Sequence, residues 1–237
     1  MTGKNAQSTA AFPWRSMIGL AIYMLLNPVI LFVSAGTVNW MMAWVYSGVA
    51  IVLTLVSRMM MFRWNPELAQ ERANYRDAEG VKSWDRYLGA LVGIYGNMAI
   101  LIVAGLDKRF GWSPAMVRWI PWIALTIFLS GFALGTWALV ENKFFSAVVR
   151  IQTDRGHKVC RSGPYGFVRH PGYLGAIIFS AATPLILGAI WALIPMGITV
   201  MVTILRTALE DRTLQAELEG YQSYSEQTRY RLIPGLW

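Results

Sequence analysis

The sequence predicts an all-α fold, a polytopic bundle of transmembrane helices with about six crossings, counting a C-terminal helical hairpin. Of its 237 residues, 55% are hydrophobic and only 14% are charged, a balance that is unusual for a soluble domain. Several uncharged stretches are also long enough to cross about 30 Å of hydrocarbon as a helix. We therefore expect an integral membrane protein that contacts membrane lipids.

The N-terminal part, residues 1–140, is expected to hold four membrane spans. These spans are expected at residues 17–35, 40–57, 87–106 and 119–140. A tight GTVN turn joins the first two spans, so they should form an antiparallel hairpin. Residues 65–86 are polar with mixed charge, and Pro66 after Asn65 predicts the start of an amphipathic surface helix. We expect this linker to be cytosolic.

Glycines with small-xxx-small spacing occur in the third and fourth spans. The pairs are Gly89 with Gly93 and Gly131 with Gly135. This spacing allows two helix backbones to approach closely in lipid. It predicts close helix packing at both pairs.

The uncharged run of residues 171–205 is too long for a single crossing. It is interrupted by Pro184, Gly188 and Pro195. These residues predict a short helical hairpin that turns near Gly188, whose second helix leaves the membrane. Gly220 is expected to end that helix.

The basic residues predict the orientation of the chain. The net charge of +8 is spread over loops and forms no dense patch, so nucleic-acid binding is not expected. On the six-span layout only Lys108, Arg109 and Arg118 lie on one side, and the other 18 of the 21 Lys and Arg residues lie on the side of the termini. The positive-inside rule then makes both termini cytoplasmic, in the cell inner membrane.

Residues 150–175, on the cytoplasmic side, are the first candidate site, because they are cationic and rich in glycine and hold both histidines. Pro171 fits the first turn of the hairpin helix. Arg169 and His170 would then lie at a helix N-terminus, which favours an anion such as a carboxylate. A basic stop beside lipid headgroups is the alternative for this pair.

A charged group follows the hairpin at the membrane exit. Arg206 and Glu210 are four residues apart and share a helix face, with Asp211 beside them. A solvated surface salt bridge is the alternative to a functional site. Cys160 is the single cysteine, and no Cys/His cluster has metal-ligand spacing, so a metal site is not expected.

The order of motifs from residue 141 to the C-terminus resembles the isoprenylcysteine carboxyl methyltransferase-like family of membrane methyltransferases. The motifs are GHxVxxSGPYxxVRHPxYxG, the apolar hairpin, RxxxE with an acidic residue after it, GYxxY and RxRLIPGLW. The resemblance implies a methyltransferase core over residues 141–237, with S-adenosyl-L-methionine bound at its cytosolic end. It also implies a lipidic or small apolar methyl acceptor, including a carboxylate as in isoprenylcysteine carboxyl methylation.

The resemblance also implies roles for individual residues. The expected cofactor-binding residues are His157, Gly163, Pro164, Tyr165, Arg169, His170, Pro171, Tyr173, Glu210 and Asp211. Arg206 and Glu210 are expected to be catalytic: Arg206 orients an anionic acceptor, and Glu210 holds polar or cationic parts of the cofactor or acceptor. Where the family usually has a Glu-Glu pair, this chain has Glu210 followed by Asp211.

Other functions remain open from the residues. A phospholipid N-methyltransferase-like enzyme or a small-thiol methyltransferase would share the same core. A membrane reductase that uses NADPH is a different class, in which Arg229 and Arg231 would bind the 2′-phosphate. A non-catalytic membrane scaffold is the remaining alternative.

Overall fold

The computed structural model describes residues 14–75 and 78–237, and all regular elements in this part of the chain are helical. The α-helices are α1 (Trp14–Ala35), α2 (Met41–Trp64), α3 (Pro66–Ala73), α4 (Ser83–Ala90), α5 (Asn97–Phe110), α6 (Ile120–Glu141), α7 (Pro171–Ile186), α8 (Leu193–Glu217) and α9 (Tyr221–Gln227). The N-terminal end, which is expected to be cytoplasmic, and residues 76–77 of the expected surface helix lie outside the described residues.

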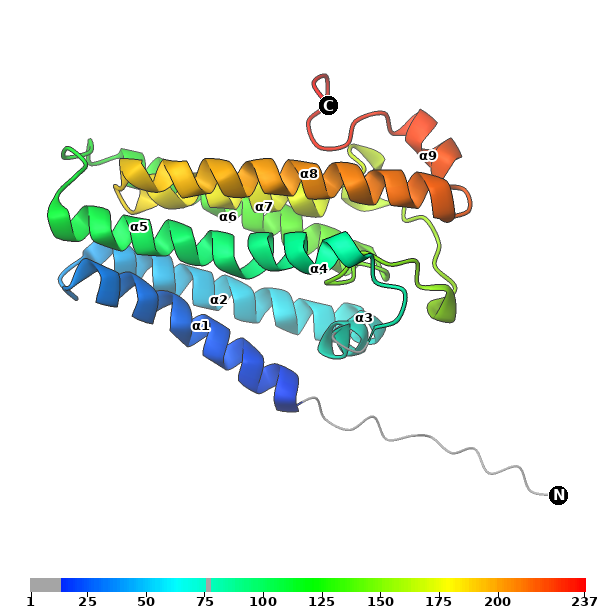
Figure 1. Cartoon of the computed structure of the whole chain (residues 1–237), viewed down its shortest axis with the longest axis horizontal. Helices are drawn as coiled ribbons and strands as arrows, with labels where there is room; N and C mark the ends of the chain where they lie inside the picture. The colour runs from blue at the N-terminus through cyan, green and yellow to red at the C-terminus, as the bar shows by residue number, and fades with distance from the viewer. Residues whose placement is uncertain (1–13, 76–77) are drawn as a thin grey trace.

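The long helices run along the long axis of the molecule (Figure 1). The connections between α1 and α2, α5 and α6, and α7 and α8 lie together at one end, on the left of the view. The short helices α3 and α9 lie at the opposite end, and the C-terminal tail turns back from α9 above α8. This arrangement agrees with the expected antiparallel hairpins.

The apolar helices make the chain a multi-pass membrane protein. Four helical stretches among the described residues are long and apolar enough to cross a membrane: Met41–Trp64, Ser83–Phe110, Ile120–Glu141 and Ile190–Glu217. Two apolar helices are shorter, Gly19–Ala35 and Pro171–Leu187. Each of the six expected spans is therefore an apolar helix, while the number of crossings stays a prediction.

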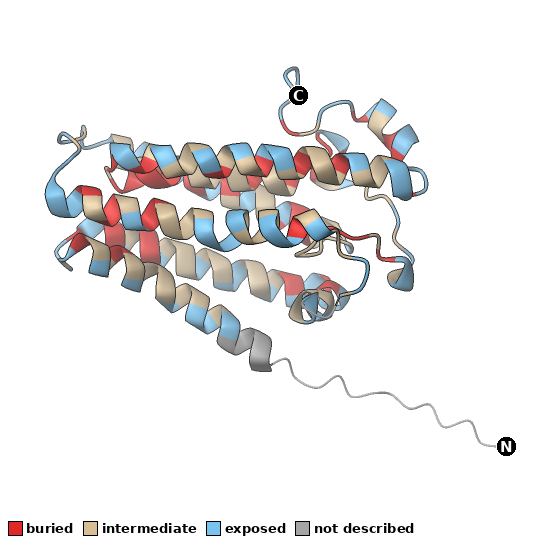
Figure 2. Ribbon diagram, viewed as in Figure 1, coloured by how far each residue is buried: buried red, intermediate tan, exposed pale blue. Residues whose placement is uncertain are grey.

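Burial follows the two faces of the helices (Figure 2). Leu31, Leu101 and Phe128 belong to the main buried cluster between helices. Large apolar side chains also lie on the outer faces, including Val33 and Met201, which are 70% and 63% exposed. Because water would penalise such a surface, these outer faces fit contact with lipid.

Glycines allow α6 and α7 to cross closely. A Cβ at Gly175 would lie only 2.5 Å from the carbonyl oxygen of Gly131 and 2.7 Å from the nitrogen of Gly135. The prediction of close packing at Gly131 and Gly135 is confirmed. The same prediction for Gly89 and Gly93 is wrong, because a Cβ at Gly93 would meet no atom within 4 Å and one at Gly89 would meet only side-chain atoms.

The predicted hairpin is confirmed. Gly188, with φ +66°, lies between α7 and α8, and Gly220, with φ +78°, follows the end of α8. The hairpin turn is tied to the loop after α5 by Asp107, whose Oδ2 accepts hydrogen bonds from the Ser113 hydroxyl at 2.6 Å and the Trp191 amide at 3.2 Å. Glycine fits both turns because it adopts positive φ without strain.

The polar linker of residues 65–86 differs from the expectation. Pro66 starts α3 as predicted, and Leu68 is fully buried beside Met61. The helix is short, however, and the next helix already begins at Ser83. Asp85, expected on a polar surface, is 1% exposed because it packs inside the bundle.

Candidate active site

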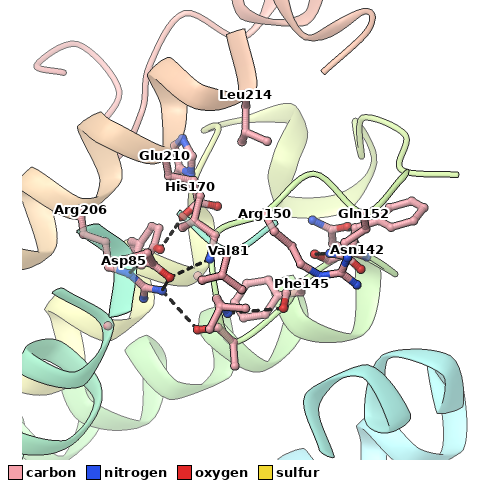
Figure 3. Close-up of a pocket in the computed structure, with 18 of the residues that line it drawn as sticks. Val81, Asp85, Asn142, Phe145, Arg150, Gln152, His170, Arg206, Glu210 and Leu214 are labelled. Atoms are coloured by element: carbon pink, nitrogen blue, oxygen red, sulfur yellow. Dashed lines mark hydrogen bonds and ion pairs between the residues drawn. The ribbon is translucent and has the colours of Figure 1, made fainter. Parts of the chain in front are cut away.

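A cavity of about 710 Å³ lies where residues 142–170, the start of α4 and the second half of α8 meet. Ligand pockets commonly have volumes of about 300–1,000 Å³. Arg206 and Asp85 lie on one side of the cavity, and Arg150 and Gln152 on the other (Figure 3). The charged and histidine side chains of the lining are Arg72, Asp85, Arg86, Arg150, His157, Lys158, Arg169, His170, Arg206 and Glu210.

The structure brings most of the predicted site residues together. Those that line the cavity are His157, Tyr165, Arg169, His170, Tyr173, Arg206 and Glu210. Those outside the lining are Gly163, Pro164, Pro171 and Asp211.

Asp211 is fully buried behind the cavity wall. Its carboxylate oxygens lie 2.9 Å from Nε of Arg169, 3.2 Å from Nε2 of His170 and 2.8 Å from Nε of Arg231. The Tyr221 hydroxyl donates a hydrogen bond to Oδ1 at 2.9 Å. Groups of the chain thus surround its oxygens, and the expectation that Asp211 binds the cofactor stays a prediction.

Arg169 and His170 directly precede α7, and Pro171 is in its first turn as predicted. Both side chains are buried, so the alternative of a basic stop among lipid headgroups does not fit. The anion that this pair contacts is Asp211 of the same chain. Asp211 offsets only part of the positive charge here, because it also contacts Arg231, and both Arg169 and His170 line the cavity.

The Gly-Pro-Tyr turn builds the wall behind the loop. Gly163 has φ +57°, and a Cβ there would lie 2.9 Å from the side chain of Glu141. Pro164 is buried, and the Tyr165 carbonyl accepts a hydrogen bond from the Tyr224 hydroxyl at 2.7 Å. Burial raises the pKa of Tyr165 well above 10, so its hydroxyl remains protonated.

His157 is held as a neutral imidazole. Its Nδ1 accepts a hydrogen bond from the Gln152 amide at 3.3 Å, and its ring centroid lies 4.6 Å from that of Phe144. Burial, and then the nearby cations Arg150 and Arg155, lower the pKa of His157 from 6.5 to about 4. Because Nδ1 accepts, the ring proton is on Nε2, which can donate a hydrogen bond.

Arg206 pairs with a residue that the sequence analysis missed. Its Nε lies 2.7 Å from Oδ1 of Asp85, and its Nη2 donates to the Ala147 carbonyl at 3.2 Å. Asp85 also accepts a hydrogen bond from the Val149 amide at 2.7 Å. The solvated salt bridge considered for Arg206 is wrong, because only 11% of its side chain is exposed.

Glu210 is the cavity carboxylate that lies four residues after Arg206. The Tyr173 hydroxyl donates a hydrogen bond to Glu210. The Arg206 guanidinium lies 5.4 Å from the centre of the Tyr173 ring. Among the described residues no cation forms an ion pair with Glu210 within 4 Å, although its charge interacts with that of Arg206, so its carboxylate can also accept a cationic or hydroxyl group of a ligand.

Arg150 ties the loop to α3. Its guanidinium lies 2.9 Å from Glu71 and 2.8 Å from Asp154. Hydrogen bonds to Asp154 and Glu71 raise the pKa of Arg150 above its usual range. No local sequence pattern predicts this cluster, because Glu71 precedes Arg150 by 79 residues.

A π-helical segment, Leu91–Gly96, joins α4 to α5 beside the cavity. Val92, Gly93 and Ile94 belong to the lining, next to Gly89 on α4. Wide π turns occur often at functional sites. Gly93 therefore lines the cavity, which explains why no other helix packs against this glycine.

Together, the fold and the cavity define a multi-pass helical membrane protein with a charged pocket at one end of the bundle. Residues 122–216 match the model of the isoprenylcysteine carboxyl methyltransferase (ICMT) family. This segment of the chain is therefore similar to that family, and the resemblance of its motifs to the family is confirmed. Helices α1–α5 precede the matched segment.

A curated relative aligns with this chain over about as many residues as the family model matches. The chain is 28% identical over 102 residues to a protein of Drosophila melanogaster named Lamin-B receptor. The aligned part is 41% of this chain and 14% of the relative. The chain thus spans a small part of that relative.

Proposed function

We propose that this chain is an integral membrane methyltransferase that uses S-adenosyl-L-methionine and acts on a lipidic or small apolar acceptor. The observation that carries this proposal is the overlap between the family match and the cavity. Residues 122–216 include His157, Tyr173, Arg206 and Glu210, which all line the cavity. The activity is thus inferred from a site to which the matched segment contributes these four residues.

The cavity residues fit this cofactor, which carries a sulfonium, an ammonium and a carboxylate. Glu210 suits a cationic or hydroxyl group, since no cation of the described chain pairs with it. His157 offers its Nε2 proton to an acceptor atom. In this proposal the residues that hold the cofactor are His157, Tyr165, Arg169, His170, Tyr173 and Glu210, and the residues that support them from behind are Gly163, Pro164, Pro171 and Asp211.

The cofactor, when bound, would supply a methyl group on a sulfonium sulfur. An acceptor atom would bond to this methyl group in line as the carbon–sulfur bond breaks and S-adenosyl-L-homocysteine leaves. The chain then needs to align the two reactants and exclude water, and it needs no covalent nucleophile. The Tyr173 hydrogen bond fixes the Glu210 carboxylate, and Asp85 fixes Arg206 beside it. A carboxylate acceptor would need no base, whereas a thiol or an amine would pass a proton to a group such as Glu210.

The alternative methyltransferase functions differ in the chemical group that accepts the methyl. A phospholipid amine and a small thiol remain candidates beside a carboxylate. The arrangement of Arg231 gives no support to a reductase, because its Nε lies 2.8 Å from Asp211 and its guanidinium 5.0 Å from the centre of the Trp237 ring. A 2′-phosphate would have to compete with this buried carboxylate.

Calorimetric titration of the detergent-purified chain tests the proposed function. We expect saturable binding of S-adenosyl-L-methionine and none of NADPH. Tyr173→Phe, which frees the Glu210 carboxylate from its hydrogen bond, should weaken cofactor binding by about 10-fold. Gly197→Ala is the control, because a Cβ there meets no atom within 4 Å. Binding of NADPH instead, or of neither compound, would contradict the proposal.

The orientation in the membrane is part of the same proposal. The charge distribution supports a cytoplasmic cavity, since only Lys108, Arg109 and Arg118 are assigned to the other side. An impermeant thiol reagent added to intact cells should leave Cys160 unmodified. It should label a cysteine placed at Arg118 in a chain that carries Cys160→Ser, and the reverse pattern would overturn the orientation.

A further inference from the structure

We propose that the tail turn, residues 231–237, docks onto the anionic lipid surface of the membrane at the cavity end of the bundle. Ile233 and Leu236 enter the interfacial layer of the bilayer, and Arg229 lies at the lipid phosphates. The turn follows residues 122–216, so the family match assigns it no role. This membrane contact is independent of the proposed methyltransferase activity.

The tip of the tail turn exposes apolar side chains. Leu236 is 76% exposed and Ile233 is 45% exposed, and Pro234 between them is exposed as well. Tyr230, directly before the turn, is 38% exposed. Water disfavours a cluster of this kind, whereas the interfacial layer of a bilayer accepts both aliphatic and tyrosine side chains.

The backbone of the tail turn pairs many of its own polar groups. The main-chain oxygen of Trp237 accepts hydrogen bonds from the amides of residues 231–233 at 2.9–3.2 Å. The Leu236 and Trp237 amides both donate to the Ile233 carbonyl at 3.1 Å. Gly235, with φ +83°, lets the chain close on itself. Unpaired backbone groups are the main obstacle to placing an irregular segment in lipid, and this turn pairs these groups internally.

Contacts with the bundle place the tail turn at the level of the membrane boundary. Arg231, its first residue, lies 2.8 Å from Asp211 on α8. Asp211 comes six residues after Leu205, the last residue of the uncharged run, and six residues span about 9 Å along a helix. The tail also turns back from α9 above α8 (Figure 1). The turn therefore lies beside the part of α8 that leaves the lipid, where Leu205 is itself 50% exposed.

Backbone hydrogen bonds hold the tail against the residues that precede α7. The Arg169 amide donates to the Tyr230 carbonyl at 2.9 Å, and the His170 amide donates to the Arg231 carbonyl at 2.9 Å. The Arg231 guanidinium lies 5.0 Å from the centre of the Trp237 ring. Because the turn is attached to the bundle in this way, docking it requires little further ordering of the chain.

The charge beside the tail turn suits anionic lipid headgroups. Arg229 and Arg231 are the charged residues of the segment 227–237, and both are basic. Arg229 is exposed directly before the turn. Anionic headgroups attract basic residues near the membrane surface, and an apolar tip beside cations is typical of an interfacial anchor. These features favour a lipid surface as the partner.

Depth measurements with a spin label test the docking. A nitroxide is attached at Leu236→Cys in a Cys160→Ser chain, which is reconstituted into nanodiscs of phosphatidylcholine and phosphatidylglycerol. We expect its collisions with oxygen to exceed those with a water-soluble nickel complex. Met201→Cys, at an exposed position in the apolar part of α8, is the control for lipid contact. Glu226→Cys, at an exposed position on α9, is the control for water contact.

Two further variants separate the turn from the label, because a nitroxide is itself apolar. Ile233→Asp should increase the nickel collisions of the label at position 236, since an aspartate disfavours insertion of the turn. Arg229→Gln should move that label toward water in nanodiscs with phosphatidylglycerol and leave it unchanged in phosphatidylcholine alone. Thermal unfolding of each variant verifies that it is folded.

Three results would overturn the proposal. The label at position 236 could collide with the nickel complex as often as the label at position 226 does. It could show no response to Ile233→Asp. Spin–spin broadening that disappears on dilution with unlabelled chain would show that the turn contacts a second copy of the chain.

Discussion

Most charged side chains around the cavity form ion pairs within the chain. Asp211 contacts Arg169, His170 and Arg231 behind the wall, and Asp85 contacts Arg206 at its side. Removing one partner of such a buried pair would leave the other charge uncompensated, which costs more than the pair itself contributes. These pairs therefore keep the cavity side chains in place before a ligand binds.

Protonation of His157 should make the stability of the folded chain depend on pH. Its pKa is lowered to about 4 in the folded chain, against about 6.5 in the unfolded chain. The unfolded chain therefore binds more protons between these values, and stability must fall as the pH falls from about 6.5 to about 4. Above about pH 6.5 the imidazole is neutral in both states, and its contribution to the stability of the folded chain is fully present.

The measurement is thermal unfolding of the wild type and of His157→Gln over this pH range. We expect the wild type to lose more stability than the variant as the pH falls, since the variant has no imidazole to protonate. A stability difference that stays constant from pH 7 to pH 4 would show that His157 titrates normally.

Sequence signals predicted residues whose roles are local, and missed residues whose roles depend on distant partners. Pro171 marks a helix start and Gly188 a turn, because backbone geometry alone requires them there. Asp85 and Arg72 lie in a polar linker that looks like a solvated surface. Their burial depends on residues more than 70 positions later, which no local pattern reveals.

At the scale of elements, the cavity depends on a close crossing of α6 and α7. This crossing fixes where α7 begins, and hence where His170 and Tyr173 lie. The glycine pattern in α6 predicted it correctly. The same pattern in α4 and the π-helical segment was misleading, because a small residue creates free space beside a cavity as readily as it allows contact between helices.

Substitution of glycines separates these two roles. Gly175→Ala places a methyl group against the backbone of α6, at 2.5 Å from the Gly131 carbonyl oxygen, and the helices cannot yield without separating. We expect a loss of about 1–3 kcal/mol in the free energy of unfolding. Gly197→Ala on α8, where a Cβ meets no atom within 4 Å, should be neutral or slightly stabilising. Equal unfolding temperatures for the two variants in detergent would refute the packing role of Gly175.

At the scale of the whole molecule, two parts of the chain build one site. The family-matched residues 122–216 supply the loop and the hairpin, while α3 and α4 add Arg72 and Asp85 from outside that segment. The overall class was predictable from composition, but the contribution of the N-terminal helices required the tertiary contacts.

Photochemical cross-linking of methyl-labelled S-adenosyl-L-methionine to the chain examines whether this cavity binds the cofactor. We expect label in peptides from residues 142–173 or 206–224, and loss of that label when excess S-adenosyl-L-homocysteine is present. Label on peptides of α1 or α2, or label that the competitor does not reduce, would contradict the assignment of the cavity as the cofactor site.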